Sequence, residues 1–213
     1  MRDLFDGHTS EAEILGPDTA VLRGFACDGD AKLLADLHAV AERAPFRNMV
    51  TPSGFTMSVA MTNCGDAGWV SDARGYRYAR RDPVSADPWP AMPATFRSLA
   101  TRAAEAAGFP DYRPDVCLIN RYAPGAKLSL HQDRDETNST APIVSVSLGL
   151  PAKFLFGGLK RNDPVARIEL RHGDVVVWGR SMRLAYHGVD PLKDGEHPAT
   201  GRCRFNLTFR EAL

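Results

Sequence analysis

The chain has 213 residues, of which 44% are hydrophobic and 24% are charged, with 26 basic and 26 acidic side chains. This length suits a single domain, 1–213, with a substantial core. The zero net charge excludes a bulk electrostatic attraction to nucleic acid or membrane, so such a partner would have to be met by a local patch. No apolar run is long enough to span a membrane and no signal peptide precedes the four cysteines, so we expect a cytoplasmic protein with reduced thiols.

The first half of the chain, to about residue 112, predicts helices and hairpins after a polar start at 1–18, which we expect to be partly mobile. Apolar residues at helical spacing, acidic caps, and proline and glycine at the ends mark the two helices. The expected elements, in chain order, are a strand at 20–25, a helix from Asp28 or Asp30 to Ala44, hairpins within 48–81, an irregular proline-rich stretch at 82–93 and a helix from Pro93 to Gly108.

The second half, from about residue 113, reads as all β, with turn signals between short strands. The predicted strands are 116–122, 128–133, 143–150, 153–156, 166–170, 174–178, 183–189 and 203–210. Short strands at this spacing are typical of a jelly roll, or double-stranded β-helix. The fold class is therefore mainly β (α+β), with flanking helices.

His131 and Asp133 end one of these strands. Residues two apart in a strand point to the same face, whereas in a helix they diverge. The two side chains should therefore share one space, as two of the three ligands of a metal site. His187, in a later predicted strand, is the best candidate for the third ligand. Two histidines and one carboxylate on a small β-barrel form the facial triad of non-haem Fe(II) oxygenases, although zinc also accepts these ligands.

The last strand alternates two kinds of residue. Its apolar set is Cys203, Phe205, Leu207 and Phe209, and its polar set is Arg204, Asn206, Thr208 and Arg210. If the polar set faces solvent, the strand is merely half-exposed. If it faces the barrel interior, two buried guanidinium groups need anionic partners, and a dicarboxylate fits them. Asn120 and Tyr122 alternate in the same way and are candidates for further hydrogen bonds.

These residues together resemble the AlkB family of Fe(II)- and 2-oxoglutarate-dependent dioxygenases. The segments that carry the resemblance are 49–52, 57–65, 120–125, 128–133, 156–158, 173–178 and 204–210, so it spans nearly the whole chain. It implies that His131, Asp133 and His187 hold Fe(II). It also implies that 2-oxoglutarate chelates the metal and is bound by Asn120, Tyr122, Arg204, Asn206 and Arg210.

The resemblance further implies the substrate, namely 1-methyladenine or 3-methylcytosine in DNA, preferably single-stranded, with RNA as a further possibility. Oxygen and 2-oxoglutarate are consumed, and the methyl group leaves as formaldehyde. In duplex DNA the target base must be flipped out of the stack. The N-terminal part then supplies a nucleotide-recognition lid, in which Trp69 stacks on the base together with His131, and Tyr76 lies near the backbone of the lesion. We expect a monomer.

Further substrate contacts are expected from Thr51, Met61, Lys127, Ser129, Gln132, Asp135, Glu136, Arg161 and the arginines of 74–81. Asp135 and Glu136 suit a cationic methylated base, although they are equally well explained as solvated loop charges. The other charged residues and Thr51 are equally well explained as ordinary surface groups. Arg134 and the loop 137–140 are expected to affect how the nucleic-acid strand is bound.

Two competing interpretations remain. One is a 2-oxoglutarate oxygenase acting on methylated RNA or protein, which would share the iron and cosubstrate residues and differ in the lid. The other is a non-enzymatic ligand-binding barrel or a cupin-like isomerase, neither of which requires the two arginines of the last strand.

Overall fold

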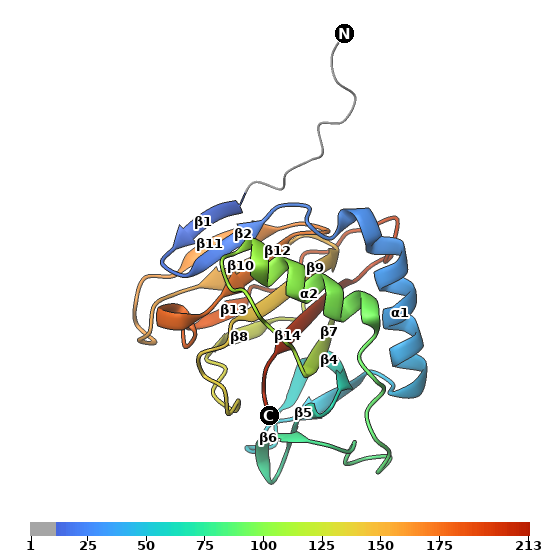
Figure 1. Cartoon of the computed structure of the whole chain (residues 1–213). Coiled ribbons are helices and arrows are strands. Elements are labelled where there is room, and N and C mark those ends of the chain that lie inside the picture. The colour runs from blue at the N-terminus through green and yellow to red at the C-terminus, as the bar shows by residue number, and fades with distance from the viewer. Residues whose placement is uncertain (1–11) are drawn as a thin grey trace.

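Two antiparallel sheets face each other, and two helices cover the outer face of the larger sheet (Figure 1). The computed structural model describes residues 12–213, so the expectation for 1–11 lies outside the described residues. The larger sheet has the order β1 (Ala12–Gly16), β2 (Thr19–Leu22), β12 (Val175–Trp178), β9 (Ile143–Gly149), β14 (Arg204–Arg210), β7 (Val116–Tyr122), β4 (Thr56–Gly65) and β3 (Arg47–Val50).

The smaller sheet has the order β11 (Ala166–Leu170), β10 (Ala152–Phe156), β13 (His187–Val189) and β8 (Leu128–His131). A separate hairpin, β5 (Gly68–Asp72) with β6 (Gly75–Ala79), lies at the lower end of the molecule beside the C-terminus (Figure 1). The helices are α1 (Asp30–Arg43) and α2 (Ala94–Ala106), with 3-10 turns at Cys27–Gly29 and Arg180–Met182. The expected mainly β jelly-roll core with flanking helices is confirmed.

The strand β14 lies between two hydrophobic cores. Its odd-numbered residues, among them Phe205 and Phe209, pack beneath α1 and α2. Its even-numbered residues face the space between the two sheets, where a second core gathers side chains such as Met61, Phe154 and Trp178. The alternation in the sequence thus reflects burial on both faces, and the polar set lies inside the barrel.

Several expected boundaries were wrong. Residues 12–16 form β1, paired with β2, and β2 ends at Leu22. Neither Asp28 nor Asp30 caps α1 as predicted, because Gly29 occupies the cap position and Asp30 is the first helical residue. The Asp30 carboxylate accepts from the Ala31 N–H through Oδ1, and its Oδ2 lies 2.9 Å from His172 Nε2.

The predicted strand at 183–189 is regular only from His187 onward. The chain turns through a 3-10 segment, and Arg183 adopts helical angles at its end. This turn places the Arg183 side chain in the interior, where it bonds two backbone carbonyls. No helix within 12–213 combines the length and hydropathy that a membrane span requires.

Candidate metal and cosubstrate site

The two small-sheet histidines lie directly opposite each other. The strand β13 pairs with β8 so that His187 faces His131, with ring centroids 4.3 Å apart. Asp133 follows the end of β8 and places Oδ1 3.6 Å from His131 Nε2 and Oδ2 3.8 Å from His187 Nε2. One donor atom from each residue falls within 4.8 Å of the others, and no second group of this kind occurs within 12–213.

Backbone carbonyls orient both imidazole rings. His131 Nδ1 lies 2.8 Å from the Ser129 oxygen and His187 Nδ1 lies 3.1 Å from the Ala185 oxygen. A carbonyl only accepts, so the proton is assigned to Nδ1 and the Nε2 lone pair faces Asp133. Burial, reinforced by the neighbouring His131, lowers the pKa of His187 to about 4, so this ring is neutral at neutral pH. That is the form that binds a metal.

Asp133 is held in its ionised form. Burial opposes the charge, but Arg210 and the two histidines keep the pKa of the carboxyl well below its usual range. Arg210 Nε and Nη2 donate to the same oxygen, Oδ2, at 2.9 and 2.6 Å. Two imidazoles and one carboxylate are the donor set expected for Fe(II), so the residues fit this metal.

Arg204 lies inside the barrel without an anionic partner. It is 1% exposed, its Nη2 donates to Ser147 Oγ at 2.9 Å, and its Cζ lies 5.1 Å from the Tyr122 ring centroid. Nε and Nη1 find no hydrogen-bond partner in the described part of the chain, and burial lowers the pKa of the guanidinium. Burying a cation whose donors lack partners costs folding free energy, and a ligand carboxylate would offset this cost by accepting from them.

Two amides line the same space. Asn120 Nδ2 donates to Asn206 Oδ1 at 3.2 Å, and Asn206 donates in turn to Ser145 Oγ at 2.8 Å. Asn120 Oδ1 has no partner among residues 12–213. Ser145 and Ser147 were missed from the sequence, although they alternate with apolar residues in β9 just as the polar set of β14 does.

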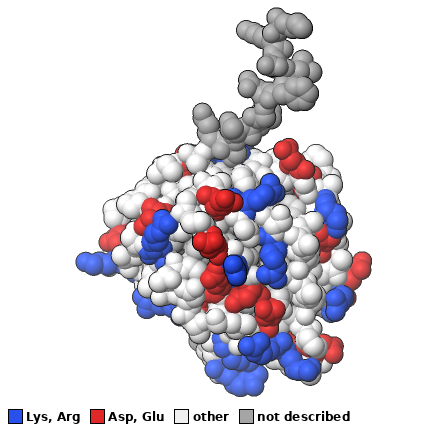
Figure 2. All heavy atoms as spheres, viewed as in Figure 1, with Lys and Arg blue, Asp and Glu red and all other residues white. Residues whose placement is uncertain are grey.

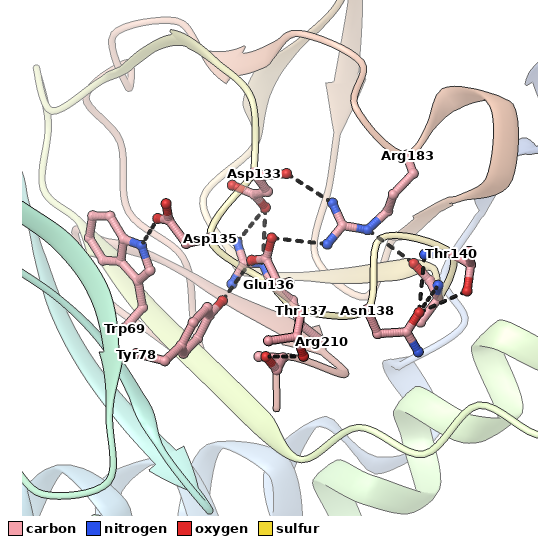
Figure 3. A network of polar contacts seen from close by, with 12 residues as sticks. Trp69, Tyr78, Asp133, Asp135, Glu136, Thr137, Asn138, Thr140, Arg183 and Arg210 are labelled. Carbon is pink, nitrogen blue, oxygen red and sulfur yellow. Dashed lines mark hydrogen bonds and ion pairs between the residues drawn. The ribbon is translucent and has the colours of Figure 1, made fainter.

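A buried ionic network extends from Asp133 along the following loop (Figure 3). Arg210 Nε lies 3.1 Å from Glu136 Oε1, and Arg183 Nη2 lies 3.1 Å from Oε2. The Tyr78 hydroxyl of β6 donates to Oε1 at 2.7 Å. Glu136, whose side chain is 3% exposed, is therefore not a solvated loop charge. Arg183 and Tyr78 were not singled out from the sequence, which gives no signal for either.

The β5–β6 hairpin places an aromatic pair beside this loop. Trp69 stacks on Tyr76, with centroids 5.5 Å apart and planes 12° apart, and its Nε1 donates to Asp135 Oδ2 at 2.7 Å. Asn63 fixes the Trp69 backbone through bonds to its N–H and its carbonyl, both 3.0 Å. Trp69 therefore stacks on Tyr76 in this structure, and stacking of Trp69 and His131 on a base stays a prediction.

The remaining predicted contacts lie at different depths. Thr51 bonds within the β3–β4 turn, to Ser53 and the Phe55 N–H. Met61 is buried in the core between the sheets. Lys127, which precedes β8, and Ser129 within it are exposed, and Arg161 Nη1 donates to the Leu130 oxygen at 3.1 Å.

Basic side chains gather at the lower end of the molecule, over β5 and β6 (Figure 2). Within this hairpin Arg74 and Arg77 pair with Asp72, while Arg80 and Arg81 beyond it are exposed. A local basic patch thus exists in a chain with no net charge.

Comparison with known proteins decides the family. Residues 18–210 match the sequence profile of the 2OG-Fe(II) oxygenase superfamily. The chain belongs to this superfamily. This oxygenase is 60% identical over 212 residues to "Alpha-ketoglutarate-dependent dioxygenase AlkB" of Escherichia coli, covering 100% of this chain and 98% of that protein.

It is also 47% identical to an AlkB homolog of Caulobacter vibrioides, over 82% of this chain and 78% of that one. The solved structure of OsALKBH1 superposes with a TM-score of 0.84 at 29% identity, covering 94% of this chain and all of that one. This oxygenase is thus a dioxygenase of the AlkB type, and its cofactors are Fe(II) and 2-oxoglutarate.

Proposed function

We propose that this oxygenase oxidatively demethylates alkylated bases in DNA, with 1-methyladenine and 3-methylcytosine in single strands as its preferred substrates. The observation that carries the proposal is the triad together with two features of its surroundings. Arg204 is a buried cation without a counter-ion among the described residues, and the aromatic pair Trp69–Tyr76 is bonded to Asp135, two residues after the ligand Asp133.

His131, Asp133 and His187 hold the iron in this proposal. Bound Fe(II) and 2-oxoglutarate supply the oxidising chemistry, which converts the N-methyl group to a hydroxymethyl group that leaves as formaldehyde, with succinate and CO2 as coproducts. Arg204 binds the far carboxylate of 2-oxoglutarate, and Asn120, whose Oδ1 has no partner among the described residues, lines the pocket beside it. Tyr122, Asn206 and Arg210 complete the pocket.

The lid receives the base. The methylated base is flat and cationic, and Trp69 offers it an aromatic face while Asp135 offers a carboxylate. Tyr76, 47% exposed and stacked on Trp69, is placed to follow the nucleotide backbone. A lesion that blocks base pairing reduces the cost of extrusion from a duplex, and a single strand removes that cost.

Phosphate contacts are assigned to the half-buried Thr51 and Gln132 and to exposed basic residues. The basic residues are Lys127, Arg134, Arg161 and the arginines beyond β6. Met61, Ser129 and Glu136 support the site from behind, because Met61 and Glu136 are buried and the Ser129 carbonyl orients His131. The monomeric state, the cytoplasmic location and the single-domain organisation stay predictions.

The test is anaerobic loading with Fe(II) and 2-oxoglutarate, followed by oxygen and a methylated single-stranded oligonucleotide. Mass spectrometry follows the oligonucleotide while succinate and formaldehyde are counted. Removal of the methyl group, matched by formaldehyde and abolished in His131→Ala, is expected. Succinate without demethylation of DNA would redirect the substrate to methylated RNA or protein, and no succinate with any of these substrates would contradict the enzyme assignment.

A further inference from the structure

Arg210 donates to only one of the two carboxylate oxygens of Asp133. An arginine facing a carboxylate commonly forms two parallel bonds, one to each oxygen. Here both donors, Nε at 2.9 Å and Nη2 at 2.6 Å, end on Oδ2. Oδ1 is contacted by no arginine of the described residues and lies 3.6 Å from His131 Nε2. One oxygen of Asp133, the one beside His131, is thus free of arginine, while Oδ2, 3.8 Å from His187 Nε2, accepts both bonds.

Glu136 is the second carboxylate beside Arg210. Its Oε1 lies 3.1 Å from Arg210 Nε, which donates to Asp133 Oδ2, so the guanidinium lies between two anions (Figure 3). The Tyr78 hydroxyl donates to the same Oε1 at 2.7 Å. Burial strengthens each of these contacts, because the interior screens charge poorly.

Arg183 anchors Glu136 and the loop that carries it. Its side chain is 2% exposed, and Nη2 lies 3.1 Å from Glu136 Oε2. Its other donors bind the main chain at both ends of the loop, the Asp133 oxygen at 3.1 Å and the Ala141 oxygen at 3.0 Å. One buried guanidinium thus links Glu136 to the main chain at both ends of the loop that carries it.

We propose that Glu136, anchored by Arg183, is a positioning residue that holds Arg210 on one oxygen of Asp133 and leaves the other oxygen free for the metal. Without Glu136, Arg210 loses its second anion and turns to the two-oxygen pairing, in which it competes with the metal for Oδ1. The inference rests on the proposed role of Asp133 as an iron ligand.

The experiment is a titration of the metal-stripped full chain with Co(II) alone, without 2-oxoglutarate or nucleic acid, followed by the d–d absorption of the ion. Loss of a residue that orients a metal ligand typically weakens affinity by about 10- to 100-fold. We expect Glu136→Gln to weaken Co(II) binding by about 10-fold or more. Arg183→Lys keeps the positive charge but loses the planar guanidinium that contacts Glu136 and two carbonyls at once. It is also expected to weaken Co(II) binding.

The matched control is Glu169→Gln, the same chemical change at an exposed carboxylate of β11 that pairs with Arg171. It should leave Co(II) affinity unchanged. Circular dichroism and thermal unfolding show whether each variant is folded. If Glu136→Gln does not fold, Tyr78→Phe carries the test, because it removes only the hydroxyl that fixes Oε1, and a smaller loss of affinity is expected.

A double-mutant cycle separates positioning from simple charge. In an Arg210→Met background the competitor for Oδ1 is gone, so Glu136→Gln should have little further effect. A full effect in that background would show that Glu136 acts by its charge alone and would overturn the proposal. Unchanged Co(II) affinity in folded Glu136→Gln would overturn it as well. Failure of the unmodified chain to bind Co(II) would instead overturn the iron site itself, and this inference with it.

Discussion

The guanidinium of Arg204 lies over the ring of Tyr122, with Cζ 5.1 Å from the ring centroid, and no carboxylate within residues 12–213 pairs with it. Six residues further along β14, Arg210 is shared between two carboxylates. The two arginines therefore have different tasks. Arg210 binds internal carboxylates and keeps one donor, Nη1, without a partner among the described residues, whereas Arg204 has no described carboxylate partner and keeps two, Nε and Nη1.

Arg204→Lys should weaken 2-oxoglutarate binding by about 10- to 100-fold, because hydrogen bonds to a charged group contribute about 1.5–3 kcal/mol and lysine cannot copy the fork. Calorimetric titration of the Co(II)-loaded protein measures the affinity. Arg121→Lys is the control, since Arg121 lies on the other face of the sheet over Phe46. Equal affinities in the unmodified chain and Arg204→Lys would remove Arg204 from the cosubstrate site.

Trp69→Ala should lower kcat/KM for the methylated oligonucleotide by about 10- to 100-fold, since stacking on an aromatic side chain contributes about 1–3 kcal/mol per base. Initial rates of formaldehyde release measure it. The affinity for 2-oxoglutarate, which Trp69 does not touch in the proposed site, should be unchanged. A parallel loss of 2-oxoglutarate binding would mean that the substitution disturbs the barrel and not base binding alone.

Gly188→Ala should separate the two histidines. Gly188 follows His187 in β13, and a Cβ there would lie 2.6 Å from the Leu128 carbonyl oxygen of β8. The strands must then move apart, at a cost of about 1–3 kcal/mol in the free energy of unfolding. The free energy of unfolding, measured by denaturant titration, and the affinity for Co(II) should both fall. Gly16→Ala, where a Cβ would meet nothing within 4 Å, is the control and should change neither quantity. If Gly188→Ala kept the stability and the Co(II) affinity of the unmodified chain, the close β8–β13 pairing would be contradicted.

The metal-free protein should lose stability as pH falls from 6.5 to about 4. The folded-state pKa of His187 is lowered from 6.5 to about 4, mainly by burial and then by His131. Between these values the unfolded chain binds a proton that the folded chain refuses, so the free energy of unfolding falls with falling pH, by up to about 3 kcal/mol. Denaturant titrations across this range measure the slope. His187→Asn should remove this contribution, and an equal slope in that variant would assign the dependence to other groups.

The sequence predicted the barrel because its signals are periodic and local. The predicted strands 116–122 and 166–170 match β7 and β11 at both ends, since turn residues bound them on each side. The polar set of β14 was left open between solvent and interior, because alternation alone does not tell which layer covers the second face. Only the packing of α1 and α2 on the apolar set decides it.

The polar network around the iron site was less accessible to sequence analysis. Arg183 sits in a stretch with strand-like composition, and its helical turn is stabilised by carbonyls more than 40 residues away in sequence. The approach of Tyr78 to Glu136 depends on how the lid hairpin packs, which no local pattern encodes. His131 and Asp133 do converge, although β8 ends at His131 and the strand geometry invoked for them stops there.

The two-sided burial of β14 also bears on which genetic changes the chain tolerates. Substitutions at odd positions act on the helix-covered core, and those at even positions act on the chemistry. Deleting or inserting one residue within the strand would reverse both sets at once, placing guanidinium groups under the helices and phenylalanines in the ligand pocket. Length variation among functional descendants of this chain should therefore fall in the turns that flank β14 and never within it.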